Sequence, residues 1–172
     1  YKSPLTFVRG WKHFLFDQDG QPFLDAYNNV PHVGHAHPRI RSVAQDQLAR
    51  VNSNTRYLHP AQIAFAEKLT QRTPDNLSVC MFVNSGSEAN ELALRLARAH
   101  SGGKDTIVLD EAYHGNTTGA IDISPYKFNR KNGVGKPEWV EIIAFPDDYQ
   151  GAFLRDDPLA GEKFAALTDA AI

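Results

Sequence analysis

The stretch Val83-Asn84-Ser85-Gly86-Ser87-Glu88-Ala89-Asn90 marks the change from a short apolar segment to a long helix. Residues 78–84, which lead into this stretch and overlap its start, are apolar almost throughout. This composition predicts a short buried strand. Residues 87–100 carry apolar side chains at helical spacing, and Gly102-Gly103 is a typical helix stop. The junction therefore predicts a strand, a tight turn and the N-terminus of a helix.

The start of this helix is suited to bind an anion. The first N–H groups of a helix have no partner within it, and the aligned peptide dipoles add partial positive charge there. Gly86 lets an anion approach the backbone, while Ser85 and Ser87 offer hydroxyl donors, so a phosphate would be well held. The alternative is a plain helix start, in which Ser85 or Ser87 is only the N-cap and Glu88 only a favourable charge.

Composition excludes several classes of protein. Of the 172 residues, 42% are hydrophobic and 22% charged, which is typical of a soluble globular domain and not of a disordered chain. A net charge of −2 gives no electrostatic reason to expect nucleic acid or membrane partners, and no apolar run is long enough to span a membrane. With one cysteine no internal disulfide can form, so we expect a cytoplasmic protein. The chain lacks an initial Met, and we expect it to begin inside a longer one.

The remaining sequence predicts an α/β protein with an N-terminal antiparallel meander. Residues 6–27 alternate strand-like runs with turn residues. Helices are expected from Pro38 until the turn residues 52–55, and over 60–72. Further on, helices alternate with short apolar strands at 106–109 and 140–145, which favours a parallel sheet. We expect residues 124–139 to be irregular and exposed, and residues 158–171 to form a final helix beginning near Asp156 or Asp157.

Several motifs resemble those of class III aminotransferases, which are pyridoxal-phosphate (PLP) enzymes of fold type I. The run from Phe82 to Ala93 resembles the family motif that holds the PLP phosphate, and Asp110-Glu111-Ala112-Tyr113-His114-Gly115 resembles a second motif, in which an aromatic residue stacks on the pyridine ring. Gly34-His35-Ala36-His37-Pro38 resembles a third, and the opening from Gly10 to Asp25 also fits. The resemblance spans nearly the whole chain in family order.

This resemblance implies PLP as cofactor, with Ser85, Gly86 and Ser87 at its phosphate and Tyr113 on its ring. His114 can line the ring, although a histidine that bonds local backbone is an equal alternative. It also implies two parts: an N-terminal segment over residues 1–59 and part of the PLP-binding large domain over residues 60–172.

Arg56 and Tyr57 are candidate substrate residues. Arginine suits planar anions, so this pair can reach a substrate carboxylate or phosphate, also across a dimer interface. Plain surface or interface packing is the alternative. His32, His35 and His37 share one loop but match no standard zinc spacing, and the sequence shows no cysteine or carboxylate beside them, so we expect no metal.

The branch of the family is suggested by two segments. Asn54-Thr55-Arg56-Tyr57-Leu58-His59 and the long stretch from Asn116 to Pro137 resemble the branch that includes ethanolamine-phosphate phospho-lyases and alanine–glyoxylate aminotransferase relatives. The implied activity is transfer of an amino group from a small amine or amino acid to a keto acid or aldehyde. Elimination of phosphate from a phosphorylated amino alcohol, or a non-catalytic truncated module, are the alternatives.

Two groups that the family chemistry needs are not recognised here. The resemblance implies a lysine that forms a Schiff base with PLP and an acid at the pyridinium nitrogen, both downstream of these motifs. We assign neither role to any residue, and none of the lysines present fits the first: Lys2, Lys12, Lys68, Lys104, Lys127, Lys131, Lys136 and Lys163. We therefore expect an N-terminal portion of an enzyme that is inactive alone.

The family's sheet order implies an incomplete sheet. In it, later strands separate the first strand of the large domain from the second and third, which would leave residues 78–84 apart from the pair 106–109 and 140–145. Such a sheet exposes edges and apolar faces. We therefore expect that the chain rearranges, associates with copies of itself or is a piece of a larger protein, and the resemblance implies a homodimer.

Overall fold

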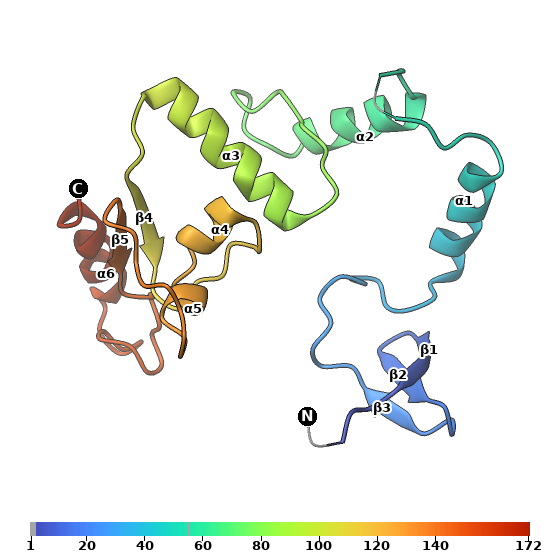
Figure 1. Ribbon diagram of the computed structural model, residues 1–172, viewed down its shortest axis with the longest axis horizontal. Helices are drawn as coiled ribbons and strands as arrows, with labels where there is room; N and C mark the ends of the chain where they lie inside the picture. Colours follow the sequence, from blue (N-terminus) through green and yellow to red (C-terminus); the bar gives the residue numbers. More distant parts are fainter. Residues whose placement is uncertain (1–2, 55) are drawn as a thin grey trace. The chain divides into compact units, whose positions relative to one another are not determined.

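The computed structural model describes residues 3–54 and 56–172, and Figure 1 shows their helices and strands. They form two compact units, one ending at Arg72 and the other beginning at Thr73. The domain boundary expected after residue 59 stays a prediction.

The first unit opens with the predicted antiparallel meander. Strands β1 (Phe7–Trp11), β2 (Phe14–Asp17) and β3 (Pro22–Leu24) pair in that order, with Trp11 opposite Phe14 and Phe14 opposite Leu24. The first turn falls at Lys12 and His13, where Lys12 adopts a left-handed φ of 53°. The second turn ends at Gly20, where φ is 83°.

Two helices complete the first unit, α1 (Pro38–Leu48) and α2 (Pro60–Thr70), and α1 ends before the turn residues at which we expected it to stop. Both begin at a proline, as predicted, because its fixed φ suits the first helical position. The α2 helix ends two residues earlier than expected, and its N-cap is His59, whose Nδ1 accepts a hydrogen bond from Ala61 N–H at 3.2 Å.

The second unit contains α3 (Gly86–Ser101), β4 (Thr106–Leu109), α4 (Thr118–Asp122), α5 (Pro125–Phe128), β5 (Val140–Ile143) and α6 (Ala160–Asp169). Strands β4 and β5 pair in parallel, from Thr106 opposite Val140 to Leu109 opposite Ile143. The sheet and the short helices α4 and α5 enclose the core, whose buried residues are Val108, Ile123, Phe128 and Val140. Leu94 of α3 packs against this cluster, so the core anchors the helix that begins at Gly86.

The buried strand predicted over residues 78–84 is wrong. This segment belongs to neither sheet, and Val79 and Met81 are 77% and 57% exposed. An apolar run becomes a buried strand only where other strands and helices cover it. In the part of the chain that the structure describes, the parallel sheet consists of β4 and β5, as the expected incomplete sheet requires.

The region 124–139 begins differently from the exposed irregular loop that we expected. It opens with α5, and Ser124, Pro125 and Phe128 are buried. Pro125 starts the helix, and Phe128 lies three residues on, so both side chains face the core. The final helix α6 is shorter than the predicted 158–171; its N-cap is Leu159, whose N–H donates to Asp157 Oδ1 at 3.0 Å.

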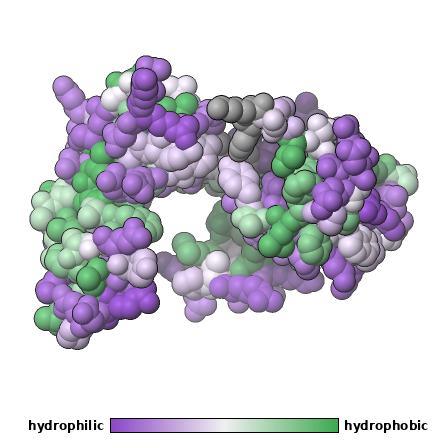
Figure 2. All heavy atoms as spheres, turned by 90° about the horizontal axis from the view of Figure 1, so that it is seen from below, coloured by the Kyte–Doolittle hydropathy of each residue, from purple (hydrophilic) through white to green (hydrophobic). Residues whose placement is uncertain are grey.

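Many large apolar side chains remain exposed. Figure 2 shows hydrophobic residues among the hydrophilic ones over the visible face. In the first unit they include Ile40, Val43 and Leu48 of α1, at 57–71% exposure. Within residues 3–54 and 56–172, no helix has the length and hydropathy that crossing a membrane requires.

Candidate functional site

The start of α3 is fixed by a pair of side-chain caps. Ser85 has extended backbone, and its Oγ accepts a hydrogen bond from Glu88 N–H at 3.2 Å. Glu88 Oε2 in turn accepts from Asn84 N–H at 2.6 Å. Ser85 is therefore the N-cap, as the plain alternative held, and the N–H groups of Gly86 and Ser87 make no hydrogen bond within the described residues.

Gly86 and Ser87 leave this helix end accessible to a ligand. A Cβ built on Gly86 would meet no atom within 4 Å, so the backbone there faces open space. Ser87 Oγ accepts a hydrogen bond from Asn116 N–H at 3.0 Å, which leaves its hydroxyl hydrogen to donate. Two backbone donors and two hydroxyl groups thus share one helix end.

Gly115 lies directly against Ser87. Its φ of 136° is one that side chains rarely adopt, and a Cβ there would lie 2.7 Å from Ser87 Oγ and 2.8 Å from Ser87 Cα. Only glycine permits this approach. The contact brings the loop that contains Tyr113 and His114 next to the first turn of α3.

Tyr113 and His114 differ in how they are held. The Tyr113 ring is 53% exposed and touches Tyr126 edge-on, with centroids 5.9 Å apart. The backbone of His114 is bonded on both sides: its N–H donates to Ser124 Oγ at 2.9 Å, and its carbonyl accepts from Asn90 Nδ2 at 2.6 Å. Its ring Nε2 is buried without a hydrogen-bond partner in the described residues.

No role could be assigned to Asn90, Glu91 or Ser124 from the sequence. Asn90 and Glu91 stand three and four residues after Ser87, so these polar side chains share one face of α3. That polar face was the available signal. The sequence carries no such signal for Ser124, since the burial of this residue depends on how α4 and α5 pack.

Arg56 and Tyr57 lie in the first unit, whereas Ser85, Gly86, Ser87, Tyr113 and His114 lie in the second. Arg56 is exposed, and its N–H donates to Asn54 Oδ1 at 3.0 Å. Tyr57 borders a cavity of about 490 Å³ beside α1 and α2. Thr55, within the branch motif, lies outside the described residues.

The histidine loop contains a histidine–carboxylate hydrogen bond that the sequence did not predict. His35 Nε2 lies 2.6 Å from Asp25 Oδ2, and their side chains are 21% and 5% exposed. We expected no carboxylate near these histidines; this was wrong for His35, because Asp25 follows β3 and the chain folds back onto it. Among the described residues, no group of three potential ligands could hold a metal ion.

This pair predicts an acid-sensitive first unit. Hydrogen bonds from Asn28 N–H and then from His35 lower the pKa of Asp25 below its ordinary value of 3.8. A lowered pKa stabilises the folded form above pH 3.8, and this contribution is lost as the pH falls below it. We expect Asp25→Asn to lose this contribution at neutral pH, so its melting temperature changes less on acidification.

The measurement is thermal unfolding of the complete protein at a series of pH values. Asp19→Asn is the matched control, since the Asp19 carboxylate accepts no hydrogen bond among the described residues. An Asp25→Asn profile parallel to that of the unaltered protein would contradict the assignment.

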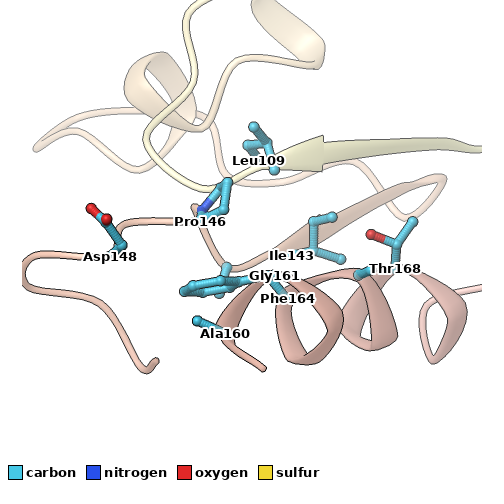
Figure 3. A pocket seen from close by; sticks show the side chains of 10 residues that line it. Leu109, Ile143, Pro146, Asp148, Ala160, Gly161, Phe164 and Thr168 are labelled. Carbon is cyan, nitrogen blue, oxygen red and sulfur yellow. The ribbon is translucent and has the colours of Figure 1, made fainter. Parts of the chain in front are cut away.

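A cavity of about 420 Å³ lies elsewhere in the second unit, between α6 and the carboxyl ends of β4 and β5 (Figure 3). Leu109, Ile143, Pro146 and Phe164 make its lining largely apolar. It includes none of the predicted site residues. Asp148 is its single ionisable side chain, so it does not compete with the start of α3 as an anion site.

Comparison with known proteins identifies the family. The class III aminotransferase model matches residues 2–168. The chain is 48% identical over 154 residues to an alanine–glyoxylate aminotransferase 2-like protein of Drosophila melanogaster. The aligned region covers 89% of this chain and 31% of that protein. The chain is also 40% identical over 161 residues to ethanolamine-phosphate phospho-lyase homolog 1 of Caenorhabditis elegans. This aligned region covers 93% of this chain and 34% of that protein. The chain thus spans about a third of the length of these relatives.

Solved structures of two enzymes are similar to this chain. A phospholyase from Arthrobacter in complex with phosphoethanolamine matches all of this chain and 40% of its own, with 39% identity and a TM-score of 0.82. A taurine:2-oxoglutarate aminotransferase from Bifidobacterium kashiwanohense matches 97% of this chain and 39% of its own at a TM-score of 0.83, and its 20% identity supports the fold alone. These neighbours confirm the expected part of fold type I. With the family model covering the α3 start and the Tyr113 loop, the chain belongs to the class III aminotransferase family.

Proposed function

We propose that Ser85, Gly86 and Ser87 bind the phosphate of PLP in the complete protein, while Tyr113 stacks on the pyridine ring and His114 lines it. PLP is the cofactor of this family, and when bound it supplies an electron sink for bond breaking at the amine-bearing carbon. The observation that carries the proposal is the close approach of Gly115 to Ser87, which joins the anion-binding helix end to the aromatic loop.

The chemistry of these groups fits a phosphate. The free N–H groups of Gly86 and Ser87 point out of a 16-residue helix whose dipole favours an anion. The nearby Glu88 carboxylate would repel one, but it bonds Asn84 N–H and leaves those two donors free. Tyr113 is half-exposed, as a ring that receives a flat ligand must be.

Ser87→Ala is expected to weaken PLP binding by about 10- to 100-fold, because a hydrogen bond to a charged group contributes about 1.5–3 kcal/mol. The dissociation constant is measured by titrating the complete apoprotein with PLP. Ser101→Ala at the other end of α3 should leave it unchanged.

Pyridoxal, which lacks the phosphate, separates a lost phosphate contact from general damage. Ser87→Ala should bind pyridoxal as the unaltered protein does. An equal loss for both ligands would contradict a phosphate contact at Ser87.

For the reaction, we propose transfer of an amino group from a small amine or amino acid to a keto acid or aldehyde, with Arg56 and Tyr57 at the substrate's carboxylate or phosphate. Phosphate elimination from a phosphorylated amino alcohol is the alternative, favoured by the 39% identity to the Arthrobacter phospholyase. An assay of the complete protein decides between the transfer and the elimination. Release of inorganic phosphate from phosphoethanolamine supports the lyase, and keto acid formation from an amino acid supports the transferase.

Residues 1–172 by themselves are expected to be inactive, as a non-catalytic module would be. No lysine of this chain is assigned the bond to PLP. Borohydride reduction of the polypeptide with PLP, followed by peptide mass spectrometry, should find no single preferred lysine. A specific adduct on one lysine would overturn this expectation.

We further propose a homodimer, which would cover exposed apolar residues such as Val43, Leu48 and Leu58. Light scattering of the complete protein tests this state. A cytoplasmic location is also proposed; relatives from Homo sapiens and Arabidopsis thaliana carry the word mitochondrial in their names, so imaging of the tagged complete protein must choose between the compartments.

A further inference from the structure

The segment from Glu111 to Gly115 has no regular structure of its own. Left-handed backbone bounds it on both sides, with φ of 60° at Glu111 and 136° at Gly115. Hydrogen bonds to neighbouring elements must therefore fix its path. One of them joins Tyr126 N–H to the carbonyl of Ala112 at 3.2 Å.

One face of α3 holds the far side of this segment. Ser87, Asn90 and Glu91, spaced as neighbours on a helix surface, bond to three residues between His114 and Thr117. Ser87 accepts from Asn116 N–H, Asn90 donates to the carbonyl of His114, and Glu91 Oε2 accepts from the Thr117 hydroxyl at 2.6 Å.

Ser124 holds the near side. Its side chain is fully buried, and its hydroxyl accepts from His114 N–H at 2.9 Å while donating to the carbonyl of Ala120 at 2.6 Å. A buried hydroxyl is tolerated when such bonds satisfy it. The two peptide groups that flank His114 are thus fixed from opposite sides, by Ser124 before it and by Asn90 after it.

Tyr113 depends on this arrangement. Its ring is half-exposed, and in the described part of the chain its ring contacts are one edge-on approach to Tyr126 and Lys127 Nζ at 5.4 Å from the centroid. Few side-chain contacts hold the ring, so the backbone on which it stands sets its position relative to α3. That backbone includes the peptide group whose N–H bonds Ser124.

We propose that Asn90 and Ser124 are positioning residues for the cofactor ring, because they fix the backbone that carries Tyr113 and His114 at the start of α3. The proposal rests on the proposed function, since it takes Tyr113 to be the residue that contacts the ring. Neither residue needs to touch PLP. Both residues would act on the angle and distance at which the cofactor ring is held.

The test compares Asn90→Ala, Asn90→Gln and Ser124→Ala in the complete holoenzyme. Visible circular dichroism per bound PLP reports the geometry around the ring. Both alanine variants are expected to change this signal and to lower kcat by about 10- to 100-fold, as misplaced reacting groups do, with a smaller change in KM. Asn90→Gln keeps the amide donor and should recover part of the dichroism signal and part of kcat.

Ser101→Ala is the matched control. Ser101 Oγ makes the same two kinds of bond as Ser124, accepting from Gly103 N–H at 3.0 Å and donating to the carbonyl of Ala97 at 2.9 Å. It lies at the far end of α3, and its replacement should leave the dichroism and kcat unchanged.

Three outcomes separate the two proposals. If the alanine variants melt earlier but keep the dichroism and kcat, Asn90 and Ser124 are only structural and the positioning role is overturned. If Ser124→Ala does not fold, the Asn90 pair decides by the same readouts. If Ser87→Ala leaves PLP affinity unchanged while the Asn90 variants shift the dichroism, the phosphate assignment fails and the positioning role stands.

Discussion

Replacement of Gly115 by alanine is expected to weaken PLP binding and to release the Tyr113 loop from α3. The new Cβ would lie 2.7 Å from Ser87 Oγ, at a φ of 136° that alanine rarely adopts. Backbone strain of this kind costs about 1–3 kcal/mol, and loss of the Asn116 to Ser87 hydrogen bond adds about 1 kcal/mol. Hydrogen exchange in the complete protein should show faster exchange over residues 113–117.

Gly135→Ala provides the control for this experiment. Gly135 also has a positive φ, of 82°, but a Cβ there would meet no atom within 4 Å, so this variant places a side chain at positive φ without the clash. It should leave PLP affinity and the exchange of residues 113–117 unchanged. If Gly115→Ala behaves like Gly135→Ala, the close contact with Ser87 does not organise the site.

Phe128→Ala is expected to cause the largest loss of stability in the second unit. Phe128 is 3% exposed within the core cluster, and removal of a buried phenylalanine side chain costs about 3–5 kcal/mol. Since each 1.4 kcal/mol is about a tenfold change in an equilibrium, amides of β4 and β5 should exchange at least about a hundredfold faster. Mass spectrometry of exchanged peptides from the complete protein measures this.

Phe145→Ala removes the same side chain from an exposed position. Phe145 is 55% exposed, so its loss should change stability by about 0.5 kcal/mol or less. Equal effects of the two variants would mean that α5 does not close the core of the second unit.

Local sequence signals located most of the regular elements. Prolines marked the starts of α1 and α2, and Gly102, with a left-handed φ of 70°, ends α3 as expected. These features depend on the backbone preferences of single residues, so they can be recognised without knowledge of tertiary contacts.

Features that depend on distant partners were less predictable. The apolar run 78–84 has the composition of a buried strand, but a strand needs neighbours in a sheet. The short helix α5 was missed because Pro125 and Asn132-Gly133 suggested a loop, whereas the burial of Phe128 against β4 and β5 decides its structure. The His35 and Asp25 pair was missed for the same reason.

The candidate site shows the same division. Ser85, Gly86, Ser87 and Tyr113 could be proposed from the sequence because they lie within recognisable motifs. Asn90 and Ser124 were assigned no role, because their importance lies in which backbone groups they bond across 24 and 10 residues. Only the folded arrangement shows that both fix His114.

A crystal structure of the complete protein with PLP tests the assignment of the phosphate most directly. The predicted result is a phosphate whose oxygens lie within hydrogen-bond distance of the N–H groups of Gly86 and Ser87 and of a Ser85 or Ser87 hydroxyl. A phosphate bound elsewhere, with those two N–H groups directed at water, would contradict it.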